Sequence, residues 1–318
     1  MDSGNREHKD RLFTYLFGAE ENRAWTLSLF NAVAGTSYTD PSEITITTIR
    51  EIMYLGAHND LSFLMAGMMN LYEQQSTYNP NMPARMLEYL ADLYAKLMAD
   101  LNISKYSRRL NPLPVPKLVV FYNGTDAMPD EKILSLKDAF SNPKESDVDV
   151  TVRMLNINLG HNRKLMASCK PLEEYAWLVA EIRKNVKRKK AALRNSARRA
   201  VKKGQEPAPK VPTKVILRYA IDRAIADMPE GFEIKHFLLV NQAEVNGMLL
   251  TEFDYDYEMR LIRRDEREEG ERREREKTIA NLLKTHTPEW ICNEFSWYSP
   301  EEVYAVQAKL AVEGGSGK

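Results

Sequence analysis

The chain has 318 residues, of which 43% are hydrophobic and 28% are charged. This length suits one large domain or two, and the apolar fraction is sufficient for a buried core. Lysine plus arginine and aspartate plus glutamate each number 45, so the formal net charge is zero. Overall charge therefore does not point to nucleic acid, and any attraction to it has to come from local clusters of basic residues.

The cysteine pattern and the chain start bear on the compartment. Cys169 and Cys292 stand far apart in the sequence, which gives neither a disulfide framework nor zinc-ligand spacing and favours a reducing cytoplasm. Residues 1–10 are charged and lack the apolar core of a signal peptide. No run approaches the roughly 20 apolar residues that span a bilayer. We therefore expect a cytoplasmic protein that makes no membrane contact.

The first elements are helical. Apolar residues recur at helical spacing in residues 8–18 and 22–34, which predicts two helices. Asp10 lies one turn before the apolar stripe of the first helix. It either responds to the helix dipole or points toward acidic residues of the sheet. Residues 43–49, EITITTI, alternate isoleucine with threonine and predict a strand.

A hairpin is predicted over residues 58–76, HNDLSFLMAGMMNLYEQQS. Two β-prone runs meet at Ala66-Gly67, where glycine supplies the positive φ of a tight turn. A two-residue turn at this point places Asp60 directly opposite Glu73. Because side chains alternate along a strand, Gln75 shares their face.

The two opposed acids suggest a metal site. Like charges directly across a hairpin are destabilising, and a cation between them removes that cost. Mg²⁺ commonly binds a small number of carboxylates plus waters. Asp60 and Glu73 are therefore candidate metal ligands of a phosphodiester-cleaving site. The alternative is a pair of solvated strand-end charges, and a three-residue turn would separate the two acids.

The following segments extend an α/β pattern. A helical pattern runs from Met86 to Leu101, and Arg85 in its first turn is either a phosphate ligand or a surface arginine. KLVVFYNG (117–124) predicts a buried central strand, and residues 147–158 predict another. Together these segments predict a mixed central β-sheet flanked by helices. The sequence contains no P-loop, dinucleotide fingerprint, GxSxG elbow or HExxH element, which excludes those enzyme classes.

These motifs resemble those of the Rpn-type recombination-promoting nucleases, also called YhgA-like transposases, a branch of the PD-(D/E)XK nuclease superfamily. The resemblance covers most of residues 9–256, with a gap near 184–212. It implies a nuclease core in which Asp60 is the first acid, Glu73-Gln74-Gln75 is the (D/E)XK element, and Asp10 is the acid of the N-terminal helix. The matching stretches are KDRLFTYLFG (9–18), NDLSFLM (59–65), NLYEQQSTYNPNMPARMLEY (70–89), KLVVFYNG (117–124), LNINLGHN (155–162), CKPLEEYAWLVAEIR (169–183) and FLLVNQAEVNGMLLTEFDYD (237–256).

Two residues depart from the family pattern. Gln75 stands where the superfamily has lysine, and Thr14 follows Phe13 where the family tends to have lysine. A neutral amide cannot act as a charged stabiliser. The departures support the alternative hypothesis, in which the protein keeps the nuclease fold without catalysis and acts as a DNA-binding or interaction module. An antiphage or toxin-like nuclease would share the chemistry of the main hypothesis.

A strongly basic segment follows the last helix of the first half. Residues 183–203 hold 11 lysine and arginine residues and no acidic residue, and GQEPAPKVP follows them. We interpret 184–212 as a basic insertion with a proline-rich linker that binds DNA phosphates without sequence preference. The alternative is a solvated loop of like charges. With Arg85, the candidate DNA-binding residues are Lys187, Arg188, Lys189, Lys190, Arg194, Arg198 and Arg199.

The C-terminal part is predicted to be helical. Residues 258–277 contain eight acidic and eight basic residues, which predicts a helix with charge pairs at helical spacing. THTPEW and WYSPEE are typical of helix starts and predict short helices at 288–295 and 300–311. This pair serves either as a helix-turn-helix for DNA contact or, in the interpretation we prefer, as a packing or homo-oligomerisation element.

These observations combine into one hypothesis. We expect a PD-(D/E)XK-like core with a charged C-terminal helix and a small helical tail. The predicted function is a Mg²⁺-dependent DNA endonuclease associated with recombination or mobile elements, with Asp60, Glu73, Gln75 and Asp10 as catalytic residues. The predicted segments are a nuclease core at 1–183 and 213–257, the basic insertion at 184–212, the charged helix and tail at 258–312, and a flexible terminus at 313–318.

Overall fold

The computed structural model describes residues 12–47 and 60–315. The chain forms two compact units, residues 1–254 and 255–318. Asp10, the beginning of the predicted helix 8–18 and the end of the predicted strand 43–49 lie outside the described residues.

The first unit is built on a six-stranded mixed sheet in the order β1-β2-β3-β4-β6-β5. Neighbours from β1 to β3 are antiparallel, β3, β4 and β6 are parallel, and β5 is antiparallel to β6. The predicted mixed sheet is confirmed, while β5 was not predicted. The strands are β1 (Thr45–Ile46), β2 (Leu61–Met65), β3 (Met68–Gln75), β4 (Val115–Tyr122), β5 (Glu131–Ser135) and β6 (Thr151–Asn156).

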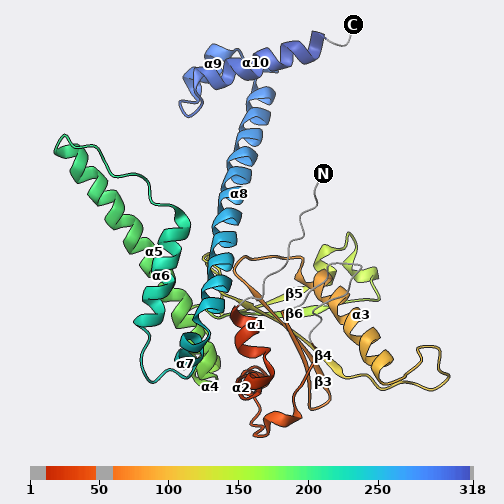
Figure 1. Cartoon of the computed structure of the whole chain (residues 1–318). Helices are drawn as coiled ribbons and strands as arrows, with labels where there is room; N and C mark the ends of the chain where they lie inside the picture. The colour runs from red at the N-terminus through yellow and green to blue at the C-terminus, as the bar shows by residue number, and fades with distance from the viewer. Residues whose placement is uncertain (1–11, 48–59, 316–318) are drawn as a thin grey trace, which may run out of the picture. The chain divides into compact units, whose positions relative to one another are not determined.

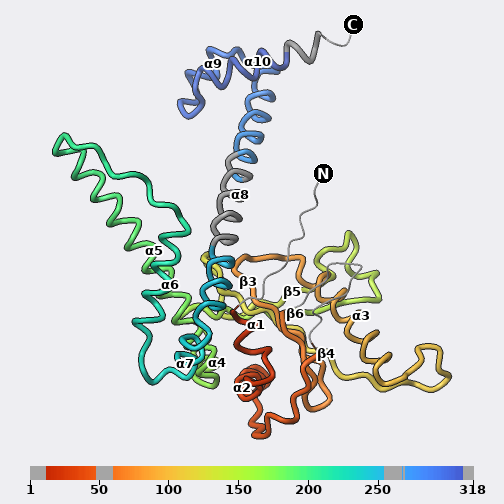
Figure 2. The backbone as a smooth tube through the Cα atoms, in the orientation of Figure 1, coloured from red at the N-terminus to blue at the C-terminus, as the bar shows by residue number. Residues whose placement is uncertain are grey.

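Helices cover both faces of the sheet (Figures 1 and 2). On one face, Tyr72 of β3 packs between Phe63 and Phe121 in a cluster that includes the helices of the larger layer. On the other face, Met69 and Leu71 pack against a single long helix, α3 (Met82–Asp100). The larger layer consists of α1 (Leu12–Phe17), α2 (Arg23–Ala34), α4 (Arg163–Ser168), α5 (Lys170–Lys202), α6 (Thr213–Ala226), α7 (Glu233–Val240) and the beginning of α8 (Gln242–Leu282).

The basic segment is part of a long helix. α5 continues through residues 183–202 without a break, and α6 packs back along it as the second arm of a helical hairpin (Figure 1). The Nζ atom of Lys189 lies 4.3 Å from the ring centroid of Tyr219 on α6. Most of the lysine and arginine side chains of this segment are exposed to solvent.

The second unit contains the remainder of α8, α9 (Pro288–Glu294) and α10 (Pro300–Gly315), as the helix-start signals predict. The Thr287 side chain caps α9 by accepting a hydrogen bond from the Trp290 N–H at 3.3 Å. Ser299 and Glu302 form a reciprocal capping box at the start of α10. A small core holds the helices together and consists of Ile279, Ile291, Val303 and Val306.

Across residues 12–47 and 60–315, the structure contains no helix with both the length and the apolar character needed to cross a membrane.

The turn between β2 and β3 has the predicted two-residue geometry. Ala66 and Gly67 have φ values of +50° and +73°, both in the left-handed region that twisted hairpins require. The predicted register is confirmed by the pairs Leu61–Tyr72, Phe63–Asn70 and Met65–Met68. Glycine adopts this conformation without strain, whereas Ala66 does so at a steric cost.

Replacing Ala66 with asparagine should raise the free energy of unfolding by about 1 kcal/mol, because asparagine tolerates the left-handed conformation better than alanine. Urea denaturation of the full chain measures this change. Ala208→Asn in the exposed loop between α5 and α6 is the control and should have little effect. Equal stability of the two variants would show that Ala66 is not strained.

Candidate active site

Two acidic side chains meet where β2 and β3 leave the turn-distal end of the hairpin. Asp60 lies directly beyond the last ladder pair, Leu61–Tyr72. The Asp60 backbone N–H donates to Oε1 of Glu73 at 3.1 Å, and Oδ2 of Asp60 accepts from the Gln74 N–H at 2.7 Å. These reciprocal side chain to backbone hydrogen bonds hold the two predicted acids next to each other.

The acids belong to a buried patch on the α3 face of the sheet. Glu73 and Gln75 alternate with Tyr72 and Gln74 along β3, so they share the face that Leu71 presents to α3. The Glu73 side chain is only 3% exposed. A carboxylate this deeply buried requires donors or a cation nearby, because leaving it uncompensated is costly.

Arg85 in the first turn of α3 supplies that positive charge. Its Nη2 lies 3.9 Å from Oε2 of Glu73 and donates to the Tyr89 hydroxyl at 2.8 Å. The guanidinium carbon also lies 5.6 Å from the Tyr89 ring centroid. The structure therefore brings the predicted phosphate ligand into the same site as the acids, together with Tyr89, which was not predicted. The spacing of four residues between Arg85 and Tyr89 on one helix is the signal that indicates their contact.

The charges of this patch shift the pKa values of its members. Burial acts to lower the pKa of Arg85, but the negative charge of Glu73 and the hydrogen bond to Tyr89 outweigh it and raise the pKa. Burial, with the charge of Glu73, raises the pKa of Tyr89. Arg85 therefore stays positively charged and Tyr89 stays a neutral hydroxyl at neutral pH.

Gln75 links the strand to the arginine. With its amide oriented to match donors with acceptors, Oε1 accepts from Arg85 Nη1 at 3.0 Å and Nε2 donates to the Thr77 carbonyl at 3.3 Å. Gln75 is therefore a neutral side chain on this face of β3, and Arg85, which it contacts, contributes the positive charge beside Glu73.

The oxygen donors of the patch belong to the ligand types that Mg²⁺ takes. Asp60 and Glu73 provide carboxylates, and Gln75 provides an amide oxygen. Mg²⁺ typically binds one or two carboxylates and retains several of its waters. Among the described residues, no group of three or more histidine, cysteine, aspartate or glutamate side chains is arranged to hold a metal ion. The predicted third acid, Asp10, lies outside the described residues. A metal site here would depend on two acids and water.

A polar network borders the patch at the carboxyl ends of β3 and β4. Gln74 Nε2 donates to Asn123 Oδ1 at 2.7 Å, and Asn123 Nδ2 donates to the Tyr175 hydroxyl at 3.2 Å. Arg183 of α5 donates to the Asn123 carbonyl and, at 3.1 Å, to Oδ1 of Asn158. Arg183, at the start of the basic segment of α5, is thereby hydrogen-bonded to the end of β4, the strand that lies next to β3 with its Glu73. The sequence pair Asn123-Gly124 predicts a turn at the end of β4. The hydrogen bond from Arg183 to the Asn123 carbonyl, by contrast, depends on the tertiary fold and has no signal in the sequence.

The predicted DNA-binding residues of α5 lie apart from the acids. Six of the seven are solvent-exposed, and Lys189 is half-buried against Tyr219. The exposed residues are Lys187, Arg188, Lys190, Arg194, Arg198 and Arg199. On a helix of 3.6 residues per turn, Lys187, Lys190, Arg194 and Arg198 fall on one side. The helix thus presents a stripe of positive charge.

Comparison of this chain with protein-family models, with curated proteins and with solved structures found no match.

Replacing Arg85 with methionine should lower the free energy of unfolding by about 1–3 kcal/mol, because Glu73 loses its nearby cation while remaining buried. Urea denaturation at neutral pH measures the change. In a Glu73→Gln background the same substitution should cost much less, since the neutral amide has no charge to balance.

Arg108→Met, at an exposed position in the loop after α3, is the matched control and should leave stability within about 0.5 kcal/mol of wild type. An equal loss for Arg85→Met in both backgrounds would show that packing of the arginine stem, and not its charge, stabilises this site.

Proposed function

We propose that this protein is a Mg²⁺-dependent endonuclease that hydrolyses phosphodiester bonds in DNA. The observation that carries the proposal is the pairing of Asp60 with buried Glu73 at the open end of a hairpin. Gln75 and Arg85 stand beside them on one face of a mixed sheet. A role in recombination or at mobile elements is the setting that the resemblance implies.

The division of labour follows from the contacts. Asp60 and Glu73 would hold Mg²⁺, which when bound supplies Lewis acidity and lowers the pKa of a bound water. Gln75 accepts from Arg85 and so orients its guanidinium. Arg85 offers planar N–H donors that suit a phosphate and neutralises its charge. The hydrogen bonds from the backbone of Asp60 and Gln74 limit the movement of the two carboxylates.

The basic stripe of α5 supports DNA as the substrate. Its lysine and arginine side chains match the charge of a phosphate backbone and carry no information about base sequence. At the start of the basic segment, Arg183 donates a hydrogen bond to the Asn123 carbonyl. The Asn123 side chain in turn accepts one from Gln74, the neighbour of Glu73. Binding along α5 would therefore act on a helix that is linked through Asn123 to Gln74, the neighbour of Glu73 on β3.

A second function is favoured by the position of Arg85. Its guanidinium already balances Glu73, and each acid already accepts a backbone N–H across the hairpin. A protein that uses these groups only to stabilise the hairpin would be a DNA-binding or interaction module without catalysis. The distinction between the two functions is whether Mg²⁺ binds at the acids.

Asp60→Asn should reduce Mg²⁺-dependent nicking of plasmid DNA by at least about 100-fold, since the metal loses a charged oxygen ligand. Mg²⁺ should also raise the melting temperature of wild type, because binding to the folded state stabilises it. The variant should lose that shift.

Asp100→Asn at the exposed end of α3 removes the same charge away from the site and should keep both properties. If wild type neither nicks DNA nor responds to Mg²⁺, or if Asp60→Asn responds as wild type does, the binding module is the better assignment.

Replacing Lys187, Arg194 and Arg198 together with glutamine should weaken DNA binding and reduce the slope of log K against log salt by about 3, because three phosphate contacts are removed. Fluorescence anisotropy over a salt series in EDTA measures both without cleavage.

A triple change of Lys96, Lys117 and Lys144 to glutamine is the control, as these lysines are exposed on other elements and carry the same total charge. Identical slopes for the two triple variants would assign the effect to net charge instead of to α5.

A further inference from the structure

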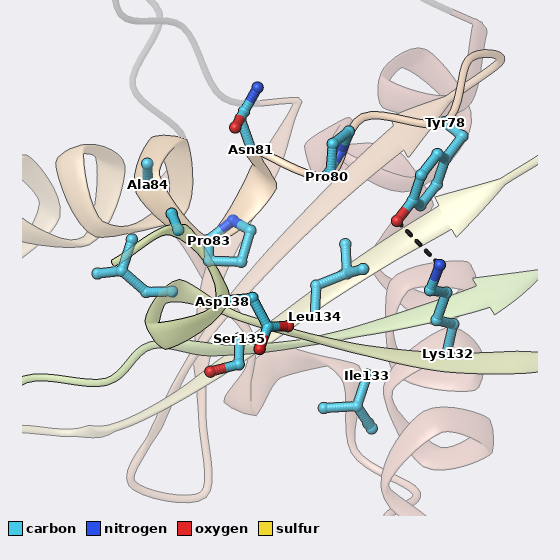
Figure 3. A pocket seen from close by; sticks show the side chains of 12 residues that line it. Tyr78, Pro80, Asn81, Pro83, Ala84, Lys132, Ile133, Leu134, Ser135 and Asp138 are labelled. Carbon is cyan, nitrogen blue, oxygen red and sulfur yellow. Dashed lines mark hydrogen bonds between the residues drawn. The ribbon is translucent and has the colours of Figure 1, made fainter. Parts of the chain in front are cut away.

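A cavity of about 430 Å³ lies on the α3 face of the sheet, between the start of α3 and β5 (Figure 3). Its size falls in the lower part of the range of roughly 300–1,000 Å³ that is usual for small-ligand pockets. The predicted functional residues do not line it. Its lining combines apolar side chains with a cation at one end and a carboxylate at the other.

The cationic end is a lysine paired with an aromatic ring. The Nζ atom of Lys132 donates to the Tyr78 hydroxyl at 2.9 Å and lies 4.4 Å from the centroid of the Tyr78 ring. An ammonium group has three N–H donors, so this one hydrogen bond leaves donor capacity for an anion. Tyr78 also offers a ring on which a flat group can stack. This end suits a phosphate with an adjacent planar group.

The rest of the cavity differs in character. Leu134 lies between the two ends and provides an apolar floor, while Pro83 and Ala84 approach from α3 (Figure 3). Asp138 lies at the end away from Lys132 and Tyr78 (Figure 3). Its carboxylate accepts hydrogen bonds, as the exocyclic amines of nucleobases require. A ligand that matches this lining has an anionic group, a planar apolar body and N–H donors, in that order along its length. A nucleoside monophosphate has this order of groups.

Some residues that line the cavity are close in the sequence to residues of the candidate active site. Tyr78 follows Gln75 by three residues, and Ala84 in the lining directly precedes Arg85. Both sites lie on the α3 face of the sheet, since Leu134 belongs to the same apolar cluster as Leu71. A nucleic-acid strand held at the acids would have its neighbouring nucleotides near the loop that separates the two sites.

We propose that this cavity binds one nucleotide of the DNA strand, next to the nucleotide whose phosphate lies at the acids. Lys132 binds its phosphate, Tyr78 stacks on its base, and Asp138 accepts from the base edge. The inference rests on the proposed function for the identity of the strand. A free mononucleotide has the same chemistry, and the experiment separates the two sources.

The test measures binding by the full-length protein in EDTA, so that no metal-dependent cleavage intervenes. The probes are a short fluorescent single-stranded oligonucleotide and deoxyadenosine monophosphate. Lys132→Met removes the cation and keeps the stem, and Ala139→Trp fills the cavity from an exposed lining position without changing charge. Lys144→Met removes one charge from an exposed position outside the cavity.

Lys132→Met and Ala139→Trp should each weaken oligonucleotide binding about tenfold, as loss of a stacked nucleotide would. Lys144→Met should change it less than about twofold, as one distant charge would. Equal effects of Lys132→Met and Lys144→Met, with none from Ala139→Trp, would overturn the proposal. So would mononucleotide binding that both cavity variants abolish while the oligonucleotide is unaffected, because the cavity would then serve a free nucleotide.

The Mg²⁺-dependent nicking assay keeps this result separate from the proposed function. If the cavity variants weaken strand binding in a protein that does not nick DNA, the nucleotide site stands and the nuclease does not. If wild type nicks DNA and the cavity variants bind the oligonucleotide as wild type does, the nuclease stands and the nucleotide site does not.

Discussion

The register of β3 against β2 is the constraint on which the candidate site depends. Two consecutive left-handed residues, Ala66 and Gly67, close the hairpin in two residues and determine which side chains oppose each other. A shift by one residue would turn Glu73 to the other face and away from α3. The same register places Tyr72 among the aromatic rings of the larger layer. Core packing and site geometry therefore stabilise the same pairing.

Burial of Glu73 sets the electrostatics of the site. A carboxylate on this face requires compensation, and in this structure the hydrogen bond from the Asp60 backbone and the charge of Arg85 provide it. A bound cation would provide the same compensation, so Arg85 and a metal are alternatives in their effect on Glu73. Because Gln75 and Tyr89 also accept hydrogen bonds from Arg85, the guanidinium keeps these two partners if a cation takes its role at Glu73.

The 76–84 segment and α3 join two chemically different regions. Arg85 and Tyr89 face the acids, while Tyr78 and the residues before Arg85 face the cavity beside β5. The start of α3 thus contributes both to a charged site and to a partly apolar cavity on one face of the sheet. In a separate contact, Arg183 of the basic helix α5 donates a hydrogen bond to the backbone carbonyl of Asn123 at the end of β4. Arg85 of α3 contacts the buried Glu73, and Arg183 of α5 contacts a backbone carbonyl. Because neither acceptor moves freely, these contacts limit the movement of both helices.

The sequence by itself determined the features that depend on local chemistry. The turn at Ala66-Gly67, the pairing of Asp60 with Glu73, and the helix starts near 288 and 300 all follow from residues close together in the chain. Only the tertiary structure decided which long-range partners these groups have. The contact of Arg85 with Glu73 requires α3 to pack on the sheet, and the cavity between α3 and β5 also requires β5 to pair with β6. Such docking is set by the summed burial of many apolar side chains, which no local pattern specifies.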